Sequence, residues 1–418
     1  MEASRASSAV KALARAVKAL ARDCGAVAVR IAPADADATT RSRMHEALAR
    51  GDLATWSYDA AYADAATDPA TLLPGARSIV CIAIPYATPV ARERRGHGRV
   101  SADAWSRDYH RRMQATLREI AARIEDLAAA RSDAHAADPN IEPNPNVILS
   151  LSKDAPQPRT TRVVCDTAPL AERAFAARAG LGWIGKHTSL IVHGLGSAVF
   201  LGEIVTTLEL EPDPPLRTSC GSCTRCIDIC PTGALRGDGT MDATRCISDL
   251  TQRRDAIPRA LRPLVGTWVW GCDLCNDACP PSRIAGRAGD PAFAPLGTDT
   301  AEPDLQHLLR LRGRAFARFR ETAMGWRGAA VLRRNAAVAL GNELDRAGVP
   351  ALAEALTGDP SPLVREHAAW ALGRIGSPRA YAALRDAARR ETDRAVLGEM
   401  ALALEPLAPQ RALNSQTL

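Results

Sequence analysis

The sequence lacks the features that would place a chain in a membrane. It has no run of eighteen apolar residues, about the minimum for a membrane-spanning helix. No signal peptide is visible, because residues 9–22 carry Lys or Arg every few positions, which predicts an amphipathic helix. We therefore expect a cytoplasmic protein with no membrane partner. Of its 418 residues, 46% are hydrophobic, enough to build the cores of two or three domains.

Cysteine, in contrast, is abundant and clustered. The chain has 11 cysteines, and in a reducing compartment clustered thiols indicate metal or redox chemistry rather than disulfides. Residues 220–235, CGSCTRCIDICPTGAL, have the spacing C-x2-C-x2-C-x3-C-P. With this spacing, three thiolates hold one 4Fe–4S cluster and the fourth serves a second cluster.

A second group of cysteines brings the number of candidate ligands to eight. Three lie in WGCDLCNDACP and one in RCISDL. By the crossing rule we predict one cluster on Cys220, Cys223, Cys226 and Cys279, and a second on Cys230, Cys246, Cys272 and Cys275. A pair of zinc sites is the alternative, but zinc ribbons pair two C-x2-C knuckles and do not use further thiols at this spacing. The remaining Cys24, Cys81 and Cys165 are predicted to fill apolar cores.

Two clusters conduct electrons to an acceptor, and residues 161–192 are the candidate region for it. Val163 and Val164 predict a short strand that ends near Asp166, followed by a helix over residues 168–179 and a glycine-rich turn. The residues alone favour Asp166 as a helix N-cap over a catalytic acid. Lys186 and His187 are equally explained as solvated loop residues, and His110 as a helix cap.

Residues 180–186 fit the phosphate-loop pattern G-x-x-x-x-G-K, but two features count against a phosphate loop. The next residue is His187 rather than Ser or Thr, and the turn follows a helix instead of joining strand to helix. We expect instead that the glycines let the backbone approach something flat or bulky.

Positive charge is concentrated near the C-terminus, although the net charge is only +6. Between residues 310 and 334, Glu321 is the single acid among eight arginines: Arg310, Arg312, Arg314, Arg318, Arg320, Arg327, Arg333 and Arg334. This stretch is either a solvated basic face or a phosphate-binding face. Beyond it, LRRNAAVALGN recurs as VREHAAWALGR with a period of 32, which predicts stacked helix-hairpin repeats.

Taken together, these segments resemble the epoxyqueuosine reductase family. The resemblance is carried by CDTAPLAERAFAARAGLGWIGKHTS, FLGEI, CGSCTRCIDICPTGA, RCISDLT, WGCDLCNDACP and LRRNAAVALGN, in this order along most of the chain. It implies cobalamin and two 4Fe–4S clusters, which reduce epoxyqueuosine to queuosine at the wobble position of tRNA. An external low-potential donor would supply the electrons, and the chain would act as a monomer.

The resemblance also assigns roles to single residues. Asp166 matches the catalytic proton donor, which we expect burial to keep protonated near neutral pH. Because D-x-H-x-x-G is absent, the cobalamin is expected to be base-off. Ala66 stands where members commonly carry Arg. Cofactor contacts are implied for Tyr109, His110, Asp166, Lys186, His187, Thr188, Ser189 and Arg245, and tRNA contacts for Arg327, Arg333 and Arg334.

The predicted fold is α+β with three consecutive domains. Residues 1–210 would form a nitroreductase-like, cobalamin-binding catalytic domain, interrupted by a mobile insertion at residues 131–160. Residues 211–290 would form a ferredoxin-like module with two 4Fe–4S clusters, and residues 291–418 a basic domain of HEAT-like repeats that faces tRNA. The alternatives are a reductive dehalogenase-like corrinoid enzyme acting on a small molecule and a ferredoxin-type electron carrier.

Overall fold

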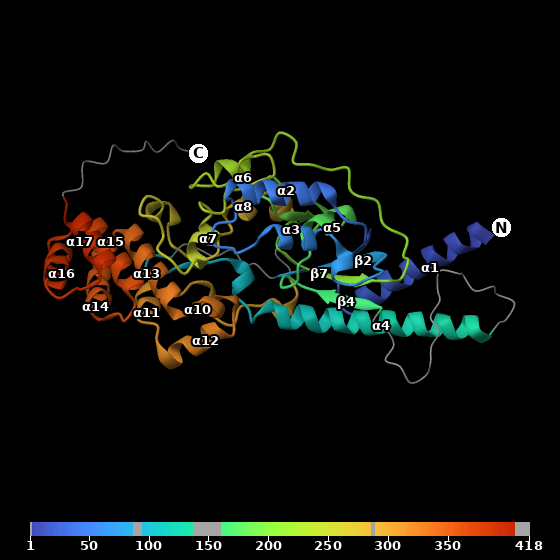
Figure 1. The fold of residues 1–418 in the computed structure, drawn as a ribbon. Helices are drawn as coiled ribbons and strands as arrows, with labels where there is room; N and C mark the ends of the chain where they lie inside the picture. Colours follow the sequence, from blue (N-terminus) through green and yellow to red (C-terminus); the bar gives the residue numbers. More distant parts are fainter. Residues whose placement is uncertain (1, 87–93, 138–159, 286–288, 406–418) are drawn as a thin grey trace. The chain divides into compact units, whose positions relative to one another are not determined.

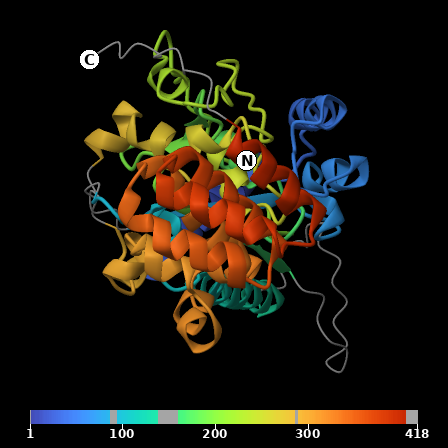
Figure 2. The same cartoon turned by 90° about the vertical axis from the view of Figure 1, so that its left-hand side faces the viewer.

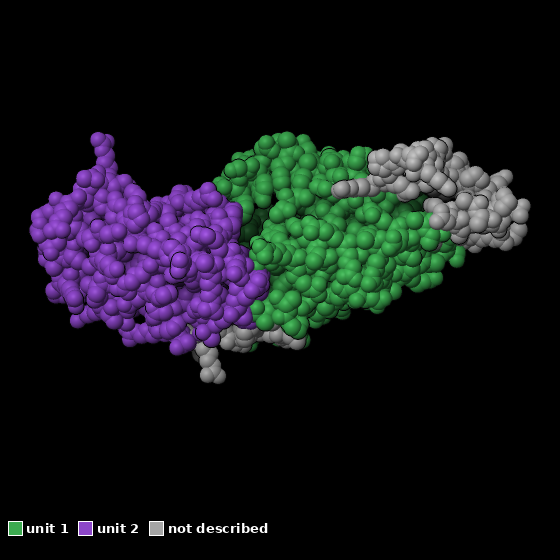
Figure 3. Space-filling view, turned by 90° about the horizontal axis from the view of Figure 1, so that it is seen from below, with its two compact units in different colours: residues 1–89, 108–244, 274–294 green, residues 90–107, 245–273, 295–418 purple. Residues whose placement is uncertain are grey.

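The computed structural model describes residues 2–86, 94–137, 160–285 and 289–405, which form two compact units. The first unit comprises residues 1–89, 108–244 and 274–294, and the second comprises residues 90–107, 245–273 and 295–418 (Figure 3). The three consecutive domains predicted from the sequence do not coincide with these units. Strand β3 (Arg99–Val100) pairs in parallel with β8 (Trp268–Trp270), so two segments distant in sequence belong to one unit.

A four-stranded antiparallel sheet forms the centre of the first unit. Its order is β1-β2-β7-β4, with β1 at Ala28–Pro33, β2 at Ser78–Pro85, β7 at Val199–Thr206 and β4 at Thr161–Val164. Valine and isoleucine are frequent in these segments, as is typical of buried strands. Glu203 of β7 pairs with Cys81 of β2 on one side and with Val164 of β4 on the other.

Helices cover both faces of this sheet. Helix α4 (Tyr109–Ala137) packs on one face through Met113, Leu117, Ile120 and Ile124, and α1 (Glu2–Asp23) packs against β1 and α4 (Figure 1). Gly202 of β7 faces α4 closely, because a Cβ there would lie 2.7 Å from a Leu117 methyl group. Helix α5 (Glu172–Arg178) packs on the opposite face in a cluster with Val164, Phe175, Ala176 and Val205.

Shorter elements complete the first unit. They are α2 (Ala38–Arg50), α3 (Ala60–Ala66), the hairpin of β5 (Gly182–Ile184) and β6 (Leu190–Val192), α6 (Arg225–Asp228), α8 (Leu274–Asp277) and α9 (Pro280–Ile284). Helix α4 continues to Ala137, so the insertion predicted from residue 131 begins in a helix, which corrects its boundary. Residues 138–159 lie outside the described part of the chain.

The second unit is mostly helical. Its helices are α7 (Ile247–Gln252), α10 (Thr298–Ala301), α11 (Leu305–Leu309), α12 (Ala317–Arg320), α13 (Ala329–Glu343), α14 (Val349–Gly358), α15 (Pro362–Ile375), α16 (Pro378–Ala388) and α17 (Arg394–Leu404). Helix α15 packs between α13 and α17 in the stack of orange and red helices (Figure 2). With the sheet of the first unit, this agrees with the predicted α+β class.

The 32-residue period has a structural cause in this stack. A Cβ on Gly341 of α13 would lie 2.9 Å from the Ala371 Cα atom of α15, and a Cβ on Gly373 of α15 would lie 2.8 Å from the Ala403 Cα atom of α17. Both glycines therefore mark points where successive repeat helices approach most closely. Among the helices that the structure describes, none is long and apolar enough to cross a membrane.

Candidate active site and cluster centre

Asp166 follows β4 in an unusual backbone conformation. Its φ is 59°, in the left-handed region that residues other than glycine seldom adopt. Its backbone N–H donates to Glu172 Oε1 at 2.8 Å. Helix α5 starts at Glu172 with Ala171 as its N-cap, so the interpretation of Asp166 as the cap of this helix is wrong.

The Asp166 side chain belongs to a chain of three titratable groups. His110 Nε2 lies 3.3 Å from Asp166 Oδ2, and His110 Nδ1 lies 2.6 Å from Asp108 Oδ1. The hydrogen bond with Asp108, and then that with Asp166, raise the pKa of His110 to about 9. Since both ring nitrogens face carboxylates, His110 is an imidazolium that donates to both.

This pairing corrects the expectation that burial keeps Asp166 protonated. The Asp166 side chain is 63% exposed. The hydrogen bond from His110 lowers the pKa of Asp166, opposed by partial desolvation and helped by a hydrogen bond from Tyr109. In this state the proton lies on His110, next to an ionised Asp166.

Aromatic rings gather around this chain. Tyr109 stacks on His110 at 4.2 Å between ring centroids and on Phe200 at 4.1 Å. Tyr62 stacks on Tyr58 at 4.1 Å, and burial, then Tyr58, Asp166 and Glu172, raise its pKa to about 12. The charges of Asp166 and Glu172 thus act on Tyr62, which the motifs did not single out.

Ala66, where the family commonly carries Arg, is buried at the end of α3.

The glycine-rich segment forms the β5–β6 hairpin, and its glycines have reasons within the protein. A Cβ on Gly180 would lie 2.1 Å from the Pro214 carbonyl oxygen, and one on Gly182 would lie 2.2 Å from the Ile191 carbonyl oxygen. The expectation that these glycines accommodate a flat external group is therefore corrected at these two positions. The hairpin also differs from a phosphate loop, which joins a strand to a helix.

The turn of this hairpin holds four of the predicted cofactor contacts. Lys186 Nζ donates to the carbonyl oxygens of Gly221 at 2.8 Å and Cys223 at 3.1 Å, which links the turn to the first cysteine loop. Thr188 has a φ of 68°, and its hydroxyl contacts the Met241 sulfur at 3.4 Å. Such a φ is a genuine outlier for a β-branched residue. Arg173 of α5, which sequence analysis did not identify, donates to the Thr188 carbonyl oxygen at 2.9 Å.

His187 is buried in the same turn with one nitrogen unsatisfied. Its Nδ1 accepts a hydrogen bond from the Ser189 backbone N–H at 3.2 Å, so the proton of the neutral ring is on Nε2. Burial lowers the pKa of His187, which keeps the ring neutral. Among the described residues, no partner is present for the buried Nε2. The turn thus retains an unused donor that a bound group could satisfy.

The four thiols predicted for the first cluster are neighbours within the first unit. Burial raises the pKa of Cys226, and the nearby thiols of Cys220, Cys279 and Cys223 raise it further. Within the described residues, no three His, Cys, Asp or Glu side chains converge as closely as one metal ion requires. Each thiolate of a 4Fe–4S cluster binds a different iron, and four neighbouring thiols are the ligand set that one such cluster needs.

The second cysteine set stays a prediction. Cys230 and Cys275 belong to the first unit, and Cys246 and Cys272 to the second. Burial alone would raise the pKa of Cys230, but hydrogen bonds from Thr232 and the following backbone outweigh it and lower the pKa. This favours the thiolate, the form that binds metal. Arg245 is exposed at the start of α7 in the second unit, and its cofactor contact likewise stays a prediction.

Two of the three arginines assigned to tRNA are buried, which corrects their assignment. Arg333 donates to both carboxylate oxygens of Asp359, at 2.7 and 3.1 Å. Arg334 is fully buried and donates to the backbone carbonyls of Asp255 and Arg253, and burial lowers its pKa to about 9. Side chains used in this way are not available to phosphates. Arg327 is half-buried and lies over the ring of Trp326 at 3.5 Å, and Trp326 is exposed.

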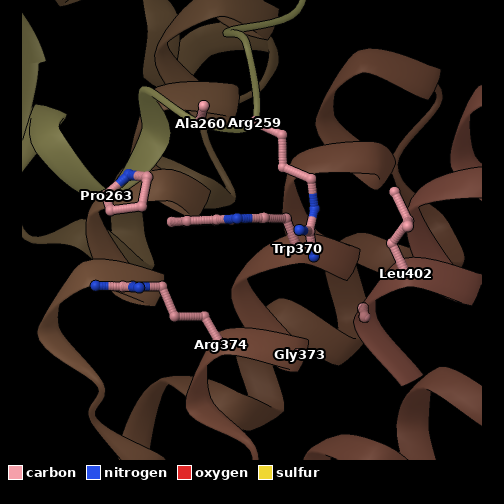
Figure 4. Close-up of a pocket in the computed structure, with 8 residues that line it drawn as sticks. Arg259, Ala260, Pro263, Trp370, Gly373, Arg374 and Leu402 are labelled. Atoms are coloured by element: carbon pink, nitrogen blue, oxygen red, sulfur yellow. The ribbon is translucent and has the colours of Figure 1, made fainter. Parts of the chain in front are cut away.

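The second unit also has a hollow of about 420 Å³ that was not predicted from the sequence. It is lined by residues of α15, α17 and the segment before β8, and Figure 4 shows the Trp370 ring with the Arg374 side chain alongside. The Arg374 guanidinium lies 5.6 Å from the centre of the Trp370 ring. No predicted site residue lines this hollow, so we do not assign it to the active site.

Comparison with known proteins identifies the family. The 4Fe-4S double cluster binding domain matches residues 219–282, the model described as epoxyqueuosine reductase QueG, DUF1730 matches residues 67–137, and HEAT repeats match residues 328–405. An epoxyqueuosine reductase of Bacillus cereus is 35% identical over 352 residues, 82% of this chain and 85% of the relative. One from Pseudomonas aeruginosa is 36% identical over 330 residues, 76% of this chain and 82% of the relative.

The chain belongs to the epoxyqueuosine reductase family.

Solved structures agree with this assignment. An epoxyqueuosine reductase solved with an epoxyqueuosine-modified tRNA-Tyr stem loop has a TM-score of 0.80 at 31% identity, covering 94% of this chain and 97% of that one. A Bacillus subtilis member, solved with its catalytic aspartate loop swung out of the active site, has a TM-score of 0.79 at 30% identity, covering 94% and 98%. The predicted family, oxidoreductase class, double-cluster module and HEAT repeats are thereby confirmed.

Proposed function

We propose that this chain reduces epoxyqueuosine to queuosine at the wobble position of tRNA, with Asp166 as the proton donor. One observation carries the proposal. Asp166 and His110 form a proton-holding pair in the same unit as the hairpin turn whose Lys186 binds the first cysteine loop. Arg173 links the two, because its charge acts on Asp166 and it donates to the Thr188 carbonyl oxygen of the turn. Proton and electron supply are thus connected in one unit. Removing an epoxide oxygen as water needs both, namely two electrons and two protons.

The proton path follows from the charges of the three groups. Asp108 holds His110 protonated, and His110 Nε2–H faces Asp166. As the epoxide C–O bond breaks, the oxygen becomes basic, His110 passes its proton to the Asp166 carboxylate, and Asp166 delivers that proton to the oxygen. The second proton of the departing water comes from solvent. Because Asp166 is ionised in the free protein, the His110 proton is the store for this step.

The electron path uses the eight clustered cysteines. Cys220, Cys223, Cys226 and Cys279 would hold one 4Fe–4S cluster, and Cys230, Cys246, Cys272 and Cys275 the other. The match to a double-cluster domain over residues 219–282 includes all eight. Electrons would enter from an external low-potential donor, and such clusters reach reduction potentials as low as about −700 mV. Lys186, bound to the carbonyl oxygens of Gly221 and Cys223, would place a positive charge at the loop that holds the first cluster.

Cobalamin is the proposed cofactor between the clusters and the substrate. Bound base-off, it would supply low-potential electrons for reduction of the epoxide. Tyr109, Lys186, His187, Thr188, Ser189 and Arg245 are the residues proposed to hold it. The unsatisfied donor at His187 Nε2 and the strained turn at Thr188 support a bound group at this hairpin. Arg173 would fix the turn through the Thr188 carbonyl.

The proposed substrate is tRNA that carries the modified base in its anticodon. A related structure contains such a stem loop, which supports the same substrate class here. In the second unit, Arg314 and Arg320 are exposed, and the described residues include no acid ion-paired with either. Exposed Trp326, with Arg327 over its ring, offers a surface on which an unpaired base can stack.

The Asp166 loop is proposed to have two positions. A Bacillus subtilis member was solved with its catalytic aspartate loop swung out of the active site. Here Asp166 is bonded to His110, which we take as the position from which protons are delivered. The left-handed backbone of Asp166 supports a loop that is held by specific contacts rather than by local preference.

The test is anaerobic reconstitution followed by turnover. Protein purified with cobalamin should contain about eight irons per chain, four for each cluster, and one cobalt. It should convert epoxyqueuosine in tRNA to queuosine when given a low-potential donor. The variant Asp166→Asn should keep iron and cobalt but lose about 10²–10⁴-fold in turnover, the usual contribution of an acid catalyst. Undiminished product from this variant would refute the role of Asp166.

A further inference from the structure

Glu203 is a fully buried acid in the middle of an apolar strand. Its neighbours two positions away on β7, Leu201 and Val205, belong to the core between the sheet and α5. Side chains alternate along a strand, so Glu203 points into the same core. It is 0% exposed, and among the described residues no N–H or hydroxyl donor bonds either of its carboxylate oxygens. A buried carboxylate without donors would be costly, so this group needs an explanation.

Glu172 belongs to the helix that packs on the core into which Glu203 points. It occupies the first position of α5, and Phe175, Ala176 and Ala179, three, four and seven residues later, are buried against the sheet. Glu172 therefore shares the helix face that packs on β7. Both side chains therefore enter the core between α5 and the sheet. Burial, then the charge of Glu172 and a hydrogen bond with it, raise the pKa of Glu203 well above its usual value.

The charge of Arg173 lowers the pKa of Glu172, but the described residues show no cation of α5 bonded to either glutamate. Arg173 donates to the Thr188 carbonyl oxygen, and Arg178 donates to the Asp35 carbonyl oxygen at 2.8 Å. The charge of Asp166 raises the pKa of Glu172, and Glu172 in turn raises the pKa of Tyr62. Burial, with both glutamates, also raises the pKa values of the thiols of Cys81 on β2 and Cys165 after β4. With no cation bonded to either group among the described residues, two carboxylates in this core can share one proton but are not expected both to ionise.

The second oxygen of Glu172 connects the pair to the active site. Glu172 Oε1 accepts the backbone N–H of Asp166 at 2.8 Å. Asp166 has the left-handed φ of 59° in this arrangement, a conformation that needs support from its surroundings. The contact therefore holds the backbone of the proposed proton donor.

We propose that Glu203 and Glu172 form a proton-sharing carboxyl pair that positions Asp166: Glu203 is the neutral acid and donates its O–H to Glu172, and the Glu172 carboxylate accepts the Asp166 N–H. The inference rests on the proposed function of Asp166. Glu203 and Glu172 are positioning residues, since neither is assigned a contact with the reacting atoms. The proton that they share stays within the pair and is separate from the proton on His110.

The first measurement is hydrogen–deuterium exchange at the Asp166 amide in the full chain, read at residue level. Glu203→Leu replaces the donor with an apolar side chain of similar size. Exchange of the Asp166 amide hydrogen should then be faster by about tenfold or more, the effect of losing one hydrogen bond to a charged group. Glu203→Gln keeps a neutral donor and should stay close to wild type. Val205→Ala, on the same face of β7, is the matched control: it should lower the Tm without selectively exposing the Asp166 amide.

The second measurement identifies the neutral acid. Infrared spectra of the wild type at neutral pH should contain the carbonyl band of a buried protonated carboxyl group, and Glu203→Gln should remove it. The band decides the proposal even if Glu203→Leu does not fold. Its absence, or Asp166 exchange in Glu203→Leu equal to that in Val205→Ala, would overturn the carboxyl pair.

The third measurement connects the pair to catalysis in the reconstituted holoenzyme. Glu203→Leu should lower kcat by about tenfold or more with little change in KM, and Glu203→Gln should restore most of the loss. A purely structural defect would not be rescued in this way. Because exchange and infrared spectra do not depend on turnover, full activity of Asp166→Asn would refute the proposed function while leaving the pair supported.

Discussion

In the second unit buried carboxylates lie against arginines, as Asp52 of the first unit does with Arg50 and Arg236, whereas in the sheet core of the first unit two carboxyl groups share one apolar environment. Asp359 is buried with Arg333, and Glu399 is buried between Arg259 and Arg262. Glu203 in the first unit is equally buried, and its partner is Glu172. Both regions are cores of apolar residues, so the difference lies in how charge is compensated.

The difference distinguishes ion pairs that stabilise the fold from titratable groups that take part in the proposed reaction. An arginine that pairs with a buried carboxylate joins two helices, and the charges cancel within the repeats. A like-charged pair in a dry core adds no stability of this kind, and strongly shifted carboxyl groups gather at functional sites. In the first unit, the shifted groups Asp108, His110, Asp166, Glu172 and Glu203 form one connected set.

Removing the acid from a paired site should give the largest effect. In Asp359→Ala, Arg333 would remain buried without its partner, at a cost of about 3–5 kcal/mol in the free energy of unfolding. Burial alone would raise the pKa of Asp359, but hydrogen bonds from Arg333 and Ser361 outweigh it and lower it, so the carboxylate is charged at neutral pH. Chemical denaturation followed by circular dichroism measures the loss.

The matched control is an ion pair at the surface of the same unit. Arg310 and Glu354 are 2.8 Å apart, with side chains 45% and 62% exposed. Glu354→Ala should change the free energy of unfolding by only about 0–1 kcal/mol, because solvent screens this pair. Equal losses in the two variants would contradict the distinction between buried and exposed pairs.

Several parts of the site follow from sequence because they depend on local spacing. The thiols of Cys220, Cys223 and Cys226 lie within seven positions, and Cys279 precedes a proline in the same way as Cys230. The repeat of Gly341 and Gly373 is equally local, because each marks the same contact between successive helices. The structure reproduces both features.

Other parts depend on partners distant in the chain. Arg333 and Arg334 belong to a basic run, but their partners are Asp359 and the carbonyls near residue 255, which no local pattern connects to them. The basic run therefore predicts an exposed phosphate-binding face, whereas the structure buries these two side chains. Glu203 did leave a signal, a single acid in the otherwise apolar strand VFLGEIVT. Its pairing with Glu172 required the packing of α5 on the sheet.

Changing the proton store should give a smaller effect that depends on pH. His110 has a raised pKa of about 9, so it is protonated below that pH and loses its proton above it. Wild-type turnover should therefore fall as the pH rises through about 9. In His110→Gln, Asp166 must hold the proton itself, with an ordinary carboxyl pKa of about 4, so the basic limb should move to lower pH. At neutral pH turnover should fall by about tenfold or more.

The pH–rate profile of the holoenzyme checks this expectation, with His45→Gln as control. His45 also contacts a carboxylate, Asp64, at 2.9 Å, but that pair is at the surface and outside the site. Its variant should keep the wild-type profile. A His110→Gln enzyme with an unshifted basic limb would show that the store of protons is elsewhere.

The smallest expected effect concerns the exposed arginines, where the comparison between compensated and uncompensated charge can be made on one short helix, α12. Arg318 pairs with Asp299 at 2.8 Å, whereas Arg320 lies near the Phe316 ring and has no ion-paired acid among the described residues. If this face binds tRNA phosphates, Arg320→Gln should weaken tRNA binding a few-fold and lower the slope of log affinity against log salt by about 1. Arg318→Gln should change the slope less, because its charge is already neutralised. Equal slopes for wild type and Arg320→Gln would exclude Arg320 from the phosphate contacts, since a lost contact must release fewer counterions.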